Sequence, residues 1–117
     1  MITENELRAG NYIECFGIHK IKYLIERGIH FEDGSGCNFN AAYPIPLTEE
    51  WLIKFGFEEV DNKSIFDYPL WIINDVEFLF QADSTFIFNS VAGNFPIHFI
   101  HQLQNLYFVL TGKELAI

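Results

Sequence analysis

The chain has 117 residues, of which half are hydrophobic and 17% aromatic, and its 16 acidic and 7 basic side chains give a formal net charge of −9. A chain of this length and apolar content can bury a core of its own, which excludes a disordered protein. The shortage of Lys and Arg argues against direct binding to nucleic acid. By size we expect one domain covering residues 1–117.

The chain offers no sign of export or of a membrane anchor. Its first residues are acidic and lead into no apolar run, which argues against a secretory signal. No apolar stretch approaches the roughly 18 residues that a membrane helix needs. Cys15 and Cys37 are the only cysteines and form no Cys-x-x-Cys motif, as is typical of a reducing compartment. We therefore expect a cytoplasmic protein that does not contact membranes.

The first third of the chain predicts a small curled antiparallel sheet. Residues 12–18 read as a strand, residues 18–26 alternate with period two, and residues 29–32 form a third short strand. The alternation places Ile21, Tyr23 and Ile25 on one face. Glycine turns at close spacing are also typical of an SH3-like barrel, and the pattern leaves that alternative open.

A short central helix follows an extended segment. Residues 41–47 contain Pro44 and Pro46 and are therefore expected to be extended. Thr48 is the predicted N-cap, with two glutamates in the first turn, and Gly56 is the predicted end.

The remaining chain predicts an antiparallel meander and a closing helix. Strands are expected in residues 57–60, 70–73, 76–82, 85–89 and 95–99. Residues 101–111 then show helical spacing that predicts a buried face and an exposed Gln104, with Gly112 ending the helix. The predicted buried face, packed on the meander, consists of Leu103, Leu106, Tyr107 and Leu110.

The predicted fold class is therefore α+β. It combines an N-terminal curled antiparallel sheet, a short central helix, an antiparallel meander and a C-terminal helix packed on the sheet.

No motif for a reaction or a cofactor emerges. His98 and His101 could supply two metal ligands, but zinc sites require three or four, so we expect no metal. Neither cysteine has the surroundings of an activated nucleophile. We expect a protein that is not an enzyme, with no catalytic residues and no cofactor.

The charge is unevenly distributed. Between Lys63 and Lys113 the chain contains no Lys or Arg. This stretch should present a negative field among aromatic side chains, which suits a basic protein partner. A solubility role is the alternative. Gln104 and Phe108 on the closing helix form a plausible protein interface, although core packing explains Phe108 equally well. The predicted partner-binding residues are Asp67, Asp75, Glu77, Asp83, Gln104 and Phe108.

Three phrases of the sequence carry a resemblance. They are residues 5–13 (NELRAGNYI), 44–57 (PIPLTEEWLIKFGF) and 98–115 (HFIHQLQNLYFVLTGKEL). Together they resemble a family of small proteins encoded by phages and prophages of Bacteroidetes. The resemblance covers both ends and the middle of the chain and misses mainly residues 58–97.

The resemblance implies a bacterial host cell and a host defence factor as the partner. Small acidic phage proteins without enzyme motifs are often inhibitors, among them anti-CRISPR proteins. The expected partner is a basic CRISPR ribonucleoprotein effector, of the RNA-targeting type VI-B. The alternative function is a small enzyme or an unrelated phage accessory protein whose motif is not recognisable.

Overall fold

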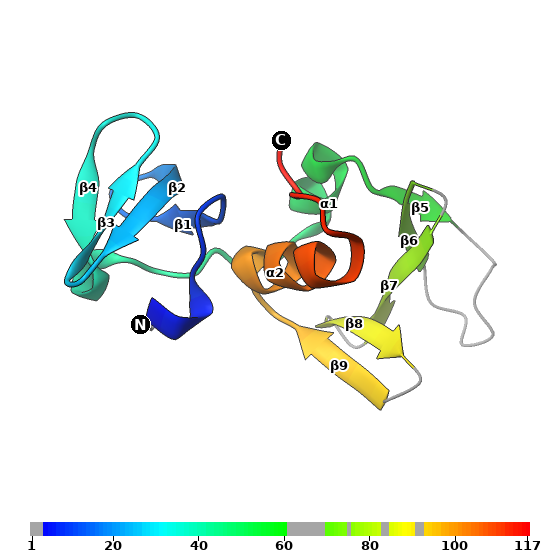
Figure 1. Ribbon diagram of the computed structural model, residues 1–117. Helices are drawn as coiled ribbons and strands as arrows, with labels where there is room; N and C mark the ends of the chain where they lie inside the picture. Colours follow the sequence, from blue (N-terminus) through cyan, green and yellow to red (C-terminus); the bar gives the residue numbers. More distant parts are fainter. Residues whose placement is uncertain (1–3, 61–69, 75, 83–84, 91–92) are drawn as a thin grey trace. The chain divides into compact units, whose positions relative to one another are not determined.

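The computed structural model describes residues 4–60, 70–74, 76–82, 85–90 and 93–117 (Figure 1). These residues form an α+β fold, as predicted, with two antiparallel sheets and two α-helices. The chain divides into two compact units. The first contains residues 1–46 and 99–116, and the second contains residues 47–98 and Ile117.

The first unit contains the predicted curled N-terminal sheet. Its four strands are antiparallel neighbours in chain order and comprise β1 (Tyr12–Glu14), β2 (Ile18–Ile25), β3 (Gly28–Phe31) and β4 (Gly36–Asn38). A 3-10 turn (Glu4–Glu6) precedes the sheet and another (Phe39–Ala41) follows it. The buried core cluster of this unit consists of Leu7, Ile13, Cys15, Ile21, Ile29, Phe31 and Ala42. The SH3-like variant of this sheet stays a prediction.

A β-bulge corrects the predicted faces of β2. Ile21 pairs with Phe31, but Tyr23 pairs with His30, so β2 has one more residue than β3 across this step. An extra residue reverses which side chains point inward beyond it. Leu24 therefore packs against the core, while Tyr23 and Ile25 are exposed. The strict alternation over this strand was wrong.

The C-terminal helix α2 (Ile100–Thr111) belongs to the first unit and contacts β1. We expected it against the meander. It ends at Gly112 in the left-handed conformation, as predicted. At its start, the side-chain Oε1 of Gln102 accepts a hydrogen bond of 3.1 Å from the backbone N–H of Phe99.

The buried face of α2 is rotated from the predicted one. Leu103 and Tyr107 are buried as expected, and Leu106 is half-buried. Leu110 is exposed and Gln104 is fully buried, so both of these predictions were wrong. The buried face also follows helical spacing and includes Ile100, Leu103, Gln104 and Tyr107. Because Gln104 is polar, a search for periodic apolar residues did not identify this face.

The second unit begins with helix α1 (Glu49–Phe55). The hydroxyl of Thr48 accepts a hydrogen bond of 3.4 Å from the backbone N–H of Trp51, which confirms Thr48 as the N-cap. Gly56 adopts the left-handed conformation that ends the helix. The buried face is the predicted one, with Trp51, Leu52 and Phe55.

The second unit also contains the predicted meander. The five strands described in it are antiparallel neighbours in chain order and comprise β5 (Glu58–Val60), β6 (Leu70–Ile73), β7 (Val76–Ala82), β8 (Thr85–Ser90) and β9 (Gly93–Ile97). The last strand begins before the predicted residue 95 and ends before 99. Trp71, Phe86 and Ile97 are buried in this unit.

Candidate functional site

Most of the predicted acidic surface lies outside the described residues. Asp67, Asp75 and Asp83 lie outside the described residues. Glu77 lies on β7, where its backbone pairs with Ile72 of β6, but its side chain also falls outside the described part. The partner-binding role of these four carboxylates stays a prediction.

Gln104, predicted to face a partner, uses its side chain inside the first unit. Its Oε1 accepts a 2.9 Å hydrogen bond from the backbone N–H of Tyr12. Its Nε2 donates to the carbonyl oxygens of Gly10 and Leu115, both at 2.9 Å. The amide is therefore occupied by three backbone groups and is not available to a partner.

The neighbouring Asn105 extends this network. Its Oδ1 accepts hydrogen bonds from Arg8 Nε at 3.1 Å and from Asn11 Nδ2 at 2.9 Å. Its Nδ2 donates to the carbonyl oxygen of Glu6 at 2.8 Å. The two amides of α2 thus fix the chain segment that precedes β1. We call the set of Arg8, Asn11, Gln104 and Asn105 the amide network.

Phe108 is partly covered by the same network. The guanidinium carbon of Arg8 lies 4.3 Å from the centre of the Phe108 ring, and Arg8 also forms an ion pair with Glu114. Phe108 remains 38% exposed, so part of its ring is open to a partner. The contact of Arg8 with the Phe108 ring and its ion pair with Glu114 are, however, sufficient to explain the position of Phe108 by the fold alone.

The amide network explains two of the phrases that carry the resemblance. Residues 5–13 and 98–115 meet in it, although they are more than 90 residues apart along the chain. Gly10 has a φ of +97°, and a Cβ there would lie 2.9 Å from Glu114 Oε2. These residue types therefore serve the fold of the first unit.

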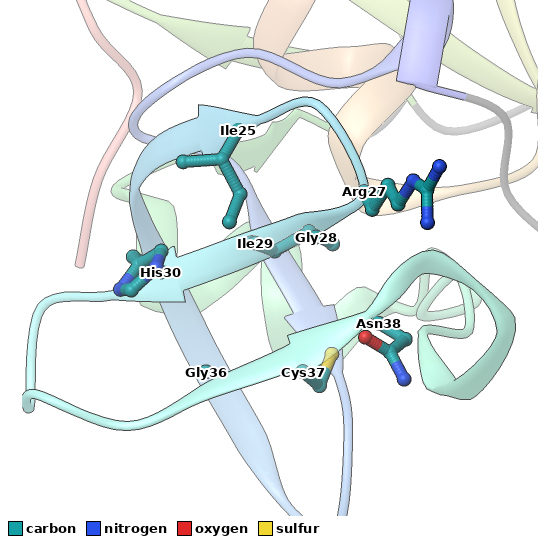
Figure 2. Close-up of a pocket in the computed structure, with 8 residues that line it drawn as sticks. All are labelled: Ile25, Arg27, Gly28, Ile29, His30, Gly36, Cys37 and Asn38. Atoms are coloured by element: carbon teal, nitrogen blue, oxygen red, sulfur yellow. The ribbon is translucent and has the colours of Figure 1, made fainter.

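A depression of about 450 Å³ lies over β3 and β4, and Figure 2 shows its lining. A Cβ on Gly28 would lie 2.9 Å from the Cys37 carbonyl oxygen, and one on Gly36 would lie 2.7 Å from that of Ile29. The two glycines therefore allow the strands to pair closely. Polar side chains stand at opposite ends, with Arg27 and Asn38 at one end and His30 at the other (Figure 2). This arrangement does not converge on one reacting atom.

The thiol beside this depression is not activated. Burial raises the pKa of Cys37 to about 12, and the neighbouring Cys15 thiol contributes to the rise. At neutral pH Cys37 is therefore a protonated thiol, which is a poor nucleophile and a poor metal ligand.

The segment Asp33–Ser35 forms a turn between β3 and β4. Asp33 Oδ1 accepts hydrogen bonds from the hydroxyl of Ser35 at 2.5 Å and from its backbone N–H at 2.9 Å. These bonds, with a smaller contribution from His19, hold the pKa of Asp33 below its usual value. The carboxylate serves the turn itself.

The two histidines weighed as metal ligands are in different environments. His98 is exposed, whereas His101 is buried on α2 and stacks on Phe99. Neither ring nitrogen of His101 has a hydrogen-bond partner among the residues that the structure describes. Burial lowers the pKa of His101, and the nearby Glu6 partly opposes this shift. In the described part of the chain, no three His, Cys, Asp or Glu side chains gather as a metal site would require. No described helix has the length and apolar character to cross a membrane.

Sequence reasoning missed Phe16, the most exposed aromatic residue in the described part of the chain. Phe16 was placed within the first strand, but the structure has a turn there, between β1 and β2. Its side chain is 98% exposed, and its φ is +52°. The glycine that follows it was the available signal, because Gly often marks a tight turn.

Comparison with known proteins gives no match. No protein-family model, curated protein or solved structure matches the chain.

Proposed function

We propose that the protein acts by binding a positively charged protein partner and catalyses no reaction of its own. The observation that carries this proposal is the concentration of negative charge in one unit. Residues 47–98 contain nine acidic and two basic side chains, a net charge of −7, whereas the first unit contains seven and five, a net charge of −2. Such a field attracts a basic surface and raises its association rate.

Described carboxylates of the second unit are consistent with this role. Glu49, Glu50 and Glu58 are exposed, so their charges face solvent. The first unit pairs several of its charges with each other, in the ion pairs Arg8–Glu114 and Lys20–Glu32.

We propose a host defence ribonucleoprotein as the partner, with the RNA-targeting type VI-B CRISPR effector as the first candidate. Support comes from the resemblance of three phrases to phage and prophage proteins and from the charge. RNA-guided effectors bind their guide and target in a positively charged channel. A protein with an acidic unit can cover or enter such a channel and block it.

The experiment is co-expression with a panel of CRISPR effectors, type VI-B first, followed by association kinetics of any complex. Capture and inhibition of an effector are the expected results. If the panel captures none, the host-defence part of the proposal is rejected.

The role of the charge is tested separately on a captured complex. The triple variant Asp75→Lys, Glu77→Lys and Asp83→Lys should slow association by about tenfold at low salt. The matched pair is Glu77→Lys and Glu26→Lys, which change the net charge equally in the two units. Equal effects of these two variants would show that net charge alone matters, and the acidic unit would not be the docking surface.

A further inference from the structure

The loop between β1 and β2 presents Phe16 to solvent in a fixed conformation. Phe16 is 98% exposed and has a φ of +52°, a region that aromatic residues rarely adopt. Holding such a residue in the left-handed region costs about 1–2 kcal/mol. Because Phe16 is exposed, core packing does not explain its strained backbone conformation. Strain of this kind is typical of residues with a functional role.

The loop is held on both sides of Phe16. Cys15 is 5% exposed and belongs to the core cluster. Its backbone N–H donates a 2.8 Å hydrogen bond to the carbonyl oxygen of Gly17. The backbone that carries the ring is therefore held in a turn, so that only the side-chain torsions of Phe16 would be restricted when it binds.

Three further exposed side chains adjoin this turn. Glu14 pairs with Ile18 on one side and with Tyr43 on the other. Directly opposed residues of antiparallel strands share a face, so these three side chains lie together. Ile18 is 53% and Tyr43 is 54% exposed. We call Glu14, Phe16, Ile18 and Tyr43 the Phe16 patch.

The patch has a carboxylate among its apolar side chains. Glu14 is exposed, and its side chain forms no ion pair or hydrogen bond in the described part of the chain. The nearest cation along the strand pair, Lys20, is engaged with Glu32 at 3.7 Å. An unpaired carboxylate among exposed aromatic and aliphatic groups selects a partner group that is both cationic and able to stack on a ring.

We propose that the Phe16 patch binds a protein segment in which an arginine lies beside apolar side chains. The guanidinium pairs with Glu14 and stacks on Tyr43, and Phe16 inserts between the apolar side chains of the partner. Rigid aromatic anchors of this kind dominate the energy of many interfaces. The inference rests on the proposed function, since it requires that the protein acts by binding another protein.

Charge decides between this occupant and two others. A second copy of the chain would bring a net charge of −9 toward an equal charge, which opposes self-association. An anionic lipid surface would be repelled by Glu14 and by the same net charge. A segment that contains an arginine is attracted both by the Glu14 carboxylate and by the negative net charge of the chain.

The test is panning of a random peptide library against the immobilised full chain, with Phe16→Asn as the comparison. Asn tolerates the left-handed conformation, so this variant keeps the turn and removes the ring. Peptides enriched on the wild type should contain arginine next to apolar residues. They should bind Phe16→Asn and Glu14→Gln at least tenfold more weakly. Phe95→Ser, which removes an exposed aromatic ring from β9, should leave binding unchanged.

Two results would overturn the inference. One is the absence of peptides that prefer the wild type over Phe16→Asn. The other is a concentration-dependent dimer in sedimentation that Phe16→Asn abolishes, which would make a second copy the occupant. The outcomes are separable from those of the proposed function. Enriched peptides without a captured effector reject the host-defence role alone, and a captured effector whose affinity is unchanged in Phe16→Asn rejects the patch alone.

Discussion

The two compact units use their polar side chains differently. The first unit has seven acidic and five basic residues and engages several of them in ion pairs and in the amide network. The second has nine acidic and two basic residues, so most of its negative charge has no cation of its own unit to pair with. Unbalanced charge destabilises a compact state slightly but favours a charged partner. The contrast indicates that the first unit uses several of its polar groups within its own fold, whereas the second unit carries an excess of negative charge that its own two cations cannot balance.

Removing the centre of the amide network should have the largest effect on the first unit. Gln104→Ala leaves the N–H of Tyr12 and the carbonyl oxygens of Gly10 and Leu115 without partners. Each unsatisfied buried group costs about 1–3 kcal/mol, so we expect a loss of about 4 kcal/mol in the free energy of unfolding. Urea denaturation measures it. Val109→Ala, exposed on the same helix, is the control, and a loss below about 1 kcal/mol for Gln104→Ala would contradict the network.

The rotated face of α2 predicts unequal effects of two leucines. Leu103→Ala should cost about 3 kcal/mol because Leu103 is fully buried. Leu110→Ala should cost less than about 0.5 kcal/mol because Leu110 is 53% exposed. Urea denaturation of both variants decides the matter. Similar losses of stability in the two variants would support the buried face of α2 that the sequence predicted, which includes Leu110.

Substitutions of Gly10 and Gly34 test how closely the backbone at Gly10 packs against the Glu114 side chain. Gly10 and Gly34 have nearly the same φ, +97° and +93°, but a Cβ meets Glu114 only at Gly10. Gly10→Ala should therefore lose about 2 kcal/mol, and Gly34→Ala about 1 kcal/mol from backbone strain alone. Thermal denaturation gives the difference. Equal losses would mean that the Glu114 side chain moves aside without cost.

His101 predicts a pH dependence that belongs to the first unit. Its pKa is below 6.5 in the folded state, so the unfolded chain takes up a proton first as the pH falls. Stability should therefore decline as the pH drops below about 6.5 and toward the lowered pKa. His101→Phe removes two buried nitrogens that have no partner among the described residues, should stabilise by about 1 kcal/mol, and should flatten this decline. Urea midpoints at pH 7.5 and 5.5 measure both effects, and an unchanged slope in His101→Phe would refute the assignment.

The charge contrast itself predicts the smallest effect. Salt screens repulsion between like charges, so added NaCl should stabilise the second unit more than the first. We expect a difference of about 0.5 kcal/mol in amide hydrogen-exchange protection between β6 and β2. Equal gains in the two strands would show that the charge excess is not felt by the fold of the second unit.

Features that depend on neighbouring residues in the chain were predictable from the sequence. The caps of α1 at Thr48 and Gly56 and the end of α2 at Gly112 were placed correctly. So were strand β6, expected after Pro69 in the sequence, and strand β7, expected from its apolar alternation. These features follow from local φ preference, side-chain capping and strand alternation, which the sequence displays directly.

The structure alone decided which polar residues are buried and which apolar residues are exposed. Gln104 is buried because backbone groups 92 and 94 residues away bond to its amide, and no local pattern reveals such partners. The bulge in β2 turned Tyr23 outward, and the turn at Phe16 replaced part of a strand. The sequence by itself determined most of the elements, the uneven distribution of charge along the chain and the fold class. Register and long-range hydrogen bonds, which depend on pairing between distant segments, determined the faces of those elements and therefore the candidate docking surface.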